Sequence, residues 1–372
     1  MSTKAKKESK KESKKKVLKY GIGIDMGKQK FHGCIKREDE DGHQKVVATK
    51  QFENIPSGHK SFYEWVNKHR KDKSVVYQIL IEVTGVYHEN LLYFLYDKGL
   101  EVCVEMPKRV KRFLESTGQK SKTDKLDSKG IAQMACERKL KRWQPLSKHI
   151  RELRALLRHR KSLIKSKVQF QNQLHAINYS SLEGKAIKRS LKSSIKRLAE
   201  QIKKLEKQIL QMAQKDKELY EQIEMIVDSI SGLGLISVLT IVAETNGFSE
   251  FKSVKQLESY AGFDVIENSS GDHKGKTKIS KRGNVHLRTA TYMPTLTIIG
   301  QKTGLFYSFY LRIVKRSGGI KKKAMVAVQR KLLVIVYTLW KKKEKFDPNY
   351  EWKKQNQNEE NREKLEAQLV TQ

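Results

Sequence analysis

Apolar residues near the start of the chain follow the pattern of short strands. Residues 20–25 alternate glycine with isoleucine and end on Asp25, which predicts a buried central strand with close backbone neighbours. Residues 30–36 and 45–52 are two further β-prone runs, joined by a polar turn. Residues 75–83 form a continuous apolar run, typical of a strand that is covered on both faces.

Helical spacing then alternates with strands. Residues 57–69 predict a helix with Ser57 as its N-cap, and a second helix carries Leu91 and Leu95 on one side. Residues 101–106 form another strand, closed by a proline, before a further helix. The order β-β-β-α-β-α-β-α predicts a mixed α/β sheet of the RNase H-like type.

The middle of the chain has a different composition. Residues 150–228 are rich in Lys, Arg, Gln, Glu and Leu, with few glycines and no proline. Apolar residues at three- and four-residue steps predict long amphipathic helices, an antiparallel pair that turns near residues 180–184. Such a stripe is usually a packing seam, and the basic faces could also follow a nucleic-acid backbone.

A globular, mainly helical region follows. Residues 229–237 resemble the hairpin of a helix-hairpin-helix, in which Gly232 and Gly234 would let backbone amides approach a phosphate; a plain glycine turn is the alternative. Further helices are expected at 254–261, 286–314 and 324–340.

Residues 267–284 form a long polar loop, which in a compact domain is more often functional than idle. It contains hydroxyl side chains next to glycines. Its cationic residues are Lys274, Lys276, Lys278, Lys281 and Arg282. A serine nucleophile attacking a phosphodiester would need this setting, and a phosphate-binding loop without a nucleophile would look the same.

The net charge of the chain indicates an anionic binding partner. The 372 residues include 77 Lys+Arg against 41 Asp+Glu, a net charge of +36, so nucleic acid is the leading partner and an anionic membrane surface the alternative. No run of about 18 apolar residues predicts a spanning helix, and no signal peptide is expected. Three scattered cysteines fit a reducing cytoplasm.

Four acids fall where strands end or a helix begins. Asp25 and Glu82 end the first and fourth strands, which are neighbours in such a sheet, and Asp124 and Asp127 share one face of a helix capped by Thr123. Two carboxylates 4 Å apart repel by about 4 kcal/mol at an effective dielectric near 20. Two divalent ions would remove that repulsion, and an all-oxygen set favours Mg²⁺ or Mn²⁺ over zinc. Alternatively, Asp124 and Asp127 only complement the helix dipole.

Several of these segments resemble one known family. Residues 23–25, 81–87 and 122–127 look like the DEDD signature of the IS110/IS1111 transposases, and the likeness continues through 260–262, 270–271 and 279–288. It spans nearly the whole chain from about residue 19 to 340, with the blocks in the family order.

The resemblance implies a RuvC-like domain whose metal ligands are Asp25, Glu82, Asp124 and Asp127. It implies a transposase domain in which Ser270 attacks DNA and forms a covalent phosphoserine link, with Ser269 as the neighbouring alternative. It also implies site-specific recombination guided by a non-coding bridge RNA. The chain departs from the family at residues 262–266, where a proline often follows, so the register of the serine loop is open.

We therefore expect five segments. They are a disordered basic tail (1–18), the RuvC-like DEDD domain (19–148), a helical coiled-coil linker (149–228), the transposase domain (229–345) and a charged tail (346–372). The expected partners are donor and target DNA, the bridge RNA and further copies of the chain as a dimer or tetramer. The expected location is the cytoplasm, at the nucleoid. The alternatives are a metal-dependent nuclease that uses water as its nucleophile, and a non-catalytic nucleic-acid-binding derivative.

Overall fold

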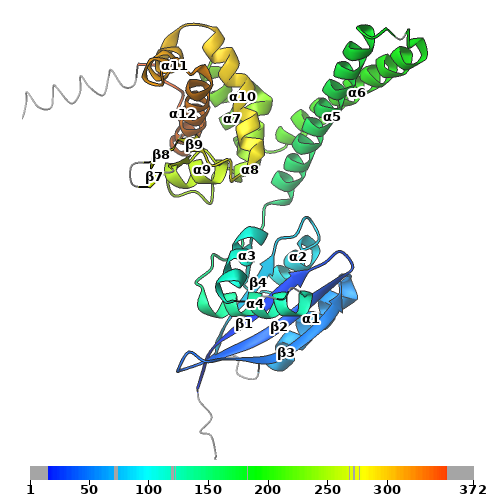
Figure 1. Ribbon diagram of the computed structural model, residues 1–372, viewed down its shortest axis with the longest axis vertical. Coiled ribbons are helices and arrows are strands. Elements are labelled where there is room, and N and C mark those ends of the chain that lie inside the picture. Colours follow the sequence, from blue (N-terminus) through cyan, green and yellow to red (C-terminus); the bar gives the residue numbers. More distant parts are fainter. Residues whose placement is uncertain are drawn as a thin grey trace, which may run out of the picture. The chain divides into compact units, whose positions relative to one another are not determined.

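The chain divides into two compact units, Met1–Pro145 and Leu146–Gln372. Figure 1 shows the elements of each. The computed structural model describes residues 16–349 apart from 71–73, 119–120, 122, 182, 268, 271–272 and 276, and only the backbone of residues 269, 270, 273 and 274. The tails expected at 1–18 and 346–372 therefore lie mostly outside the described residues.

A mixed sheet forms the centre of the first unit. Its strands are β1 (Val17–Met26), β2 (Lys30–Asp39), β3 (Gln44–Glu53), β4 (Val76–Glu82) and β5 (Val102–Glu105). They lie in the order β3-β2-β1-β4-β5. The first three pair antiparallel as a meander, whereas β4 pairs parallel with both β1 and β5. This is the RNase H-like arrangement, so the fold class predicted from the sequence is confirmed.

Helices cover both faces of this sheet (Figure 1). They are α1 (Pro56–His69), α2 (Glu89–Asp97), α3 (Pro107–Ser116) and α4 (Asp124–Glu137). Ile22 and Ile24 of β1 are fully buried in one core with α1 and α2. The alternate positions, Gly21 and Gly23, face α4, because side chains on a strand point to opposite faces in turn. Leu80 of β4 packs in a second core with α3 and α4.

The start of α1 differs from the prediction. Its N-cap is Ile55, no side chain caps it, and Pro56 occupies the first helical turn. The prediction of Ser57 as the N-cap was therefore wrong. A proline has the backbone angle of the first helical position and lacks the N–H group that a cap would satisfy, so it sets the N-cap two residues earlier than predicted.

Two long helices open the second unit. They are α5 (Lys148–Asn178) and α6 (Lys185–Ala213), which lie side by side as an antiparallel hairpin (Figure 1). Gly184, with φ +51°, precedes α6, so the predicted turn is confirmed. Arg160 of α5 donates from Nε to Glu206 of α6 over 2.7 Å, which joins the two helices beside their apolar seam.

The rest of the second unit is mainly helical. Its helices are α7 (Lys217–Ser229), α8 (Leu235–Thr245), α9 (Val254–Ala261), α10 (Val285–Gly300), α11 (Gly304–Arg316) and α12 (Lys321–Lys342). One core joins α8, α10 and α12 with residues of α5. No helix among the described residues has the length and apolarity needed to cross a bilayer.

One helix that was expected over residues 286–314 is in fact two. The chain breaks between α10 and α11, where Lys302 takes φ +57° and Gly304 takes φ +77°. Left-handed backbone cannot continue a right-handed helix. The later break at Gly318 and Gly319, with φ +67° and +85°, falls in the gap predicted between the helices at 286–314 and 324–340.

Candidate metal-dependent active site

Asp25 and Glu82 lie side by side at the ends of neighbouring parallel strands. Ile24 is in register with Ile81, so Asp25 and Glu82 hold the next equivalent positions on β1 and β4. Gly23, two residues before Asp25, packs against α4. Asp25 therefore points to the α4 side of the sheet, and Glu82 points the same way, because residues in register share a face.

The glycines of β1 bring α4 unusually close. A methyl group on Gly23 would lie 2.1 Å from the backbone nitrogen of Ala132, and one on Gly21 would lie 2.3 Å from the Ala132 oxygen. Real side chains do not make such contacts, so only glycine permits this approach. The helix can thus place its first turn beside the strand ends.

That first turn carries the other two predicted acids. Thr123 is the N-cap of α4, and its side chain accepts from the Leu126 amide over 3.2 Å, as predicted. Asp124 and Asp127 follow in the first turn, where the helix dipole favours negative charge. Asp127 is buried, at 8% exposure, and Asp124 is largely exposed.

All four predicted acids line one cavity of about 710 Å³. They reach it from three separate segments: the end of β1, the end of β4 and the start of α4. Lys30, Lys108 and Lys111 line the same cavity, and Lys108 and Lys111 come from α3. Carboxylates and lysines lining one cavity suit a divalent ion that meets a phosphate backbone.

The donor chemistry fits a divalent cation. The four acids supply oxygen atoms only, which is the set that Mg²⁺ and Mn²⁺ prefer. Among the described residues, a different group of potential metal ligands has its donor atoms within 4.8 Å of one another. It consists of Asp39, Asp41 and His43. The four acids are spread more widely than that. All four nevertheless line the same cavity.

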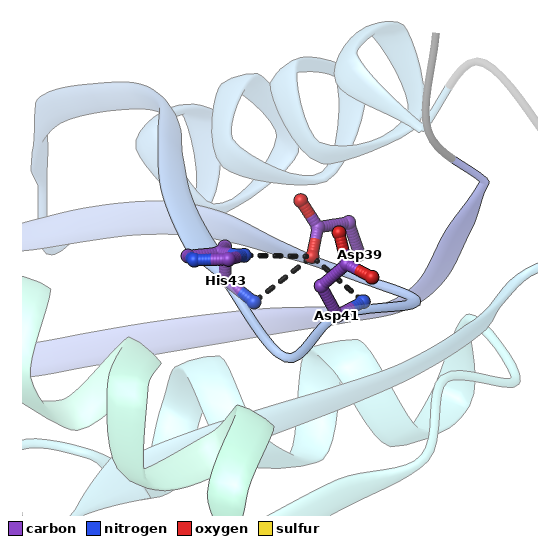
Figure 2. A group of neighbouring side chains, drawn as sticks. All are labelled: Asp39, Asp41 and His43. Carbon is purple, nitrogen blue, oxygen red and sulfur yellow. Dashed lines mark hydrogen bonds and ion pairs between the residues drawn. The ribbon is translucent and has the colours of Figure 1, made fainter. Parts of the chain in front are cut away.

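The group at Asp39 has a structural explanation (Figure 2). It forms the turn between β2 and β3, where Asp39 Oδ1 accepts from the Asp41 amide over 3.2 Å and from the His43 amide over 2.9 Å. The His43 ring lies 3.8 Å from the same oxygen. An aspartate that accepts two backbone hydrogen bonds is a common way to close a turn.

Register also places two polar residues that the sequence reading did not select. His32 of β2 is opposite Asp25, and Glu105 of β5 is opposite Glu82. His32, Asp25, Glu82 and Glu105 thus form one row across the sheet. Glu105 is buried and paired with Arg109 over 2.7 Å, whereas His32 lines the cavity. The sequence alone indicated little about this row, because it does not specify which residues of paired strands lie opposite one another.

The predicted serine belongs to the second unit. Short strands β6 (Val265–Ile266) and β9 (Lys278–Ile279) pair at the base of its loop, and β7 (Ser269–Ser270) pairs with β8 (His273–Lys274) above them. The loop expected at 267–284 therefore contains strand pairs. The side chains of Ser269, Ser270 and Lys274 lie outside the described residues, as does Lys276.

The other predicted nucleic-acid contacts of this unit are on its surface or in its turns. Lys278 and Arg282 are exposed, and Lys281 takes φ +52° after the second strand of the loop base. Gly232 takes φ +90° in the turn between α7 and α8, and Gly234 is the N-cap of α8 with open space around it. The turn between two helices is present as expected, and phosphate binding there stays a prediction.

An ionic network around the buried Glu244 anchors the C-terminal end of the loop at residues 267–284, and it was not predicted from the sequence. Arg158 of α5 donates to both oxygens of Glu244, over 2.7 and 2.8 Å, and Asn284 donates to Oε2 over 2.8 Å. Asn284 is also the N-cap of α10, accepting from the His286 amide over 2.8 Å. Burial alone would raise the pKa of Glu244, but these hydrogen bonds and the charges of Arg158 and Arg154 hold it below its ordinary value.

Two family profiles match the chain. One, for DEDD transposases of the IS110 type, is described as "Transposase" and matches residues 22–177. The other, described as "Transposase IS116/IS110/IS902 family", matches residues 224–311. The chain belongs to the IS110 family of transposases. It is thus a transposase-type recombinase with a DEDD domain, and membership of this family points to an enzyme that cleaves DNA.

Individual relatives agree with this family. The chain is 26% identical to a pilin gene-inverting protein of Moraxella bovis, over 88% of this chain and 97% of the relative. It is 24% identical to the transposase for insertion sequence element IS1111A of Coxiella burnetii, over 87% of this chain and 90% of that protein. A solved structure of T. thermophilus RuvC in complex with Holliday junction substrate aligns with 32% of this chain and 90% of its own, at 13% identity and a TM-score of 0.24.

Proposed function

We propose that this IS110-family protein cuts and rejoins DNA with two chemical groups, a divalent-metal site in the first unit and a serine in the second. The observation that carries the proposal is the meeting of Asp25, Glu82, Asp124 and Asp127 at one cavity. These acids are the DEDD set that family membership leads one to expect.

The acids hold and orient the ions in this proposal. Bound Mg²⁺ or Mn²⁺ supplies activation of an attacking oxygen and stabilisation of a leaving oxygen. Asp25, Glu82 and Asp127 come from regular elements, so their backbone positions are fixed before DNA arrives. Lys108 and Lys111, which line the same cavity, would bind DNA phosphates beside the acids.

Ser270 is the proposed nucleophile, with Ser269 as its neighbouring alternative. Its oxygen attacks a phosphorus of the DNA backbone, a serine O–P bond forms, and one P–O bond to a sugar breaks. The serine hydroxyl loses its proton as it attacks, and the departing sugar oxygen gains one and leaves as a hydroxyl. Attack by a sugar hydroxyl of the other DNA partner then reverses these bonds, which rejoins the DNA and frees the serine. Lys278, Lys281 and Arg282 would stabilise the phosphate charge in this loop.

We extend the proposal to the partners and location. The charge of +36 suits both DNA and a guide RNA, and a bridge RNA would choose the sites while the protein reads backbone and shape. Two DNA partners call for a dimer or tetramer, with the α5–α6 hairpin as the contact. The relative named for pilin gene inversion supports site-specific recombination as the outcome. Such a protein would work on DNA in the cytoplasm.

The test is a covalent protein–DNA adduct that survives denaturing electrophoresis. The wild-type protein with Mg²⁺, its element DNA and flanking RNA should form it, and both Asp25→Asn and Ser270→Ala should abolish it. Asp41→Asn is the matched control, because it alters the other carboxylate group of the unit. Metal-dependent nicking without any adduct would favour the nuclease that uses water, and full strand exchange by Ser270→Ala would refute the serine.

A further inference from the structure

His32 occupies a position that the DEDD set does not include. It lies directly opposite Asp25 on the antiparallel partner strand. Opposite residues on such strands share a face, with their Cβ atoms about 5 Å apart. The His32 side chain therefore leaves the sheet beside the Asp25 carboxylate, on the side covered by α4.

The contacts of His32 agree with this placement. Its side chain lines the same cavity as the four acids and is 22% exposed. Its Nδ1 atom lies 3.8 Å from Oδ2 of Asp124. The imidazole thus stands between a strand-end acid and a helix acid, each of which is a proposed ligand.

Glu105 at the other end of the row does not share these properties. Arg109 neutralises it at 2.7 Å, and it does not line the cavity. His32 is therefore the member of the row that can add a donor atom to the acids. An imidazole nitrogen favours transition-metal ions over Mg²⁺, whose preferred donors are oxygen atoms.

We infer that His32 is a nitrogen ligand to the divalent cation held by the acids, so that the site selects Mn²⁺ over Mg²⁺ more strongly than carboxylates alone would. This inference rests on the proposed metal site. It adds a ligand from β2, a strand that contributes none of the four acids.

The test uses full-length protein loaded with Mn²⁺ and pulsed electron paramagnetic resonance, which detects a nitrogen nucleus bonded to the ion. The wild-type protein should show imidazole nitrogen coupling, and His32→Gln should lose it. Mn²⁺ binding by His32→Gln, measured by calorimetry, should weaken about 10-fold, while Mg²⁺ binding changes less. His43→Gln is the control, because His43 belongs to the acidic turn of Figure 2, and it should keep the coupling.

Three outcomes separate the inference from the proposed function. If Mn²⁺ binds, is lost in Asp25→Asn and shows no nitrogen coupling, the acids hold the metal and His32 is not a ligand. Coupling that persists in His32→Gln and disappears in His43→Gln would also overturn the inference. If the wild-type protein binds no Mn²⁺, both the metal site and the inference fail. Circular dichroism of each variant shows whether its fold is retained.

Discussion

The close approach of β1 and α4 predicts a large effect from one methyl group. In Gly23→Ala the new Cβ would lie 2.1 Å from the Ala132 nitrogen, 2.4 Å from the Ser128 oxygen and 2.7 Å from the Ile131 carbonyl carbon. All three atoms belong to the backbone of α4, so no side chain can rotate away. The helix itself must move.

The size of that movement follows from the distances. Ordinary contact begins near 3.4 Å, so relief of the 2.1 Å contact requires the difference between them, about 1.3 Å. Overpacking of this kind costs about 1–3 kcal/mol of stability. The same shift moves Asp124 and Asp127 relative to Asp25 and Glu82, and a misplacement of about 1 Å can cost 100-fold in rate.

Two measurements test this reasoning. Urea unfolding should show the lower stability of Gly23→Ala, and Mg²⁺-dependent DNA cleavage should fall about 100-fold in the folded variant. Gly300→Ala is the matched control, because a methyl group there meets nothing within 4 Å, and it should leave both quantities nearly unchanged. Wild-type stability and cleavage in Gly23→Ala would refute the claim that this contact places the acids.

Three further predictions concern other parts of the chain. Arg158→Ala should destabilise the second unit by about 3 kcal/mol in urea unfolding, because it leaves the Glu244 charge buried without its bidentate partner. Since the folded-state pKa of Glu244 lies below its ordinary 4.5, the stability it contributes is present above that pH and is lost as pH falls through the lowered value. Thr123→Ala should cost about 1 kcal/mol by removing the N-cap of α4. Burial raises the pKa of each thiol to about 11, so in the native protein at pH 8 alkylation should be slow at Cys34, Cys103 and Cys136.

Each of these has its own control. Unfolding midpoints of Arg158→Ala that depend on pH as strongly as those of the wild type would contradict the role of the pair. Thr123→Ser keeps the capping oxygen and should restore most of the lost stability; equal losses in both variants would argue against capping. The same alkylation in urea should reach all three thiols, and rapid labelling without urea would contradict their burial.

Most features set by residues that are close together in the sequence were predicted correctly. The alternation at residues 20–25 predicted both the strand and its close neighbour, and Thr123 as an N-cap predicted the start of α4. The strand order then followed from the succession of elements. The prediction was wrong where two neighbouring residues each favour a helix start. Ser57 favours the N-cap position, but Pro56 favours the first helical turn and so makes Ile55 the N-cap of α1.

Features that join distant segments were harder to predict. Glu244 is 86 residues from Arg158 and 40 from Asn284, so no spacing rule connects them. A glutamate at the end of an otherwise apolar helix was the available signal, since such a charge needs a partner. The place of His32 beside Asp25 required the exact pairing of β1 and β2, which a run of β-prone residues does not supply.

The glycine and isoleucine alternation of β1 also protects the protein from misfolding. If β1 paired one residue out of step, Ile22 and Ile24 would be driven into the α4 backbone, where even a single methyl group is excluded. The opposite core would at the same time lose two large side chains and keep holes in their place. A slip of one residue is thus penalised twice, once by steric clash and once by lost packing, which favours the pairing that delivers Asp25 to the cavity.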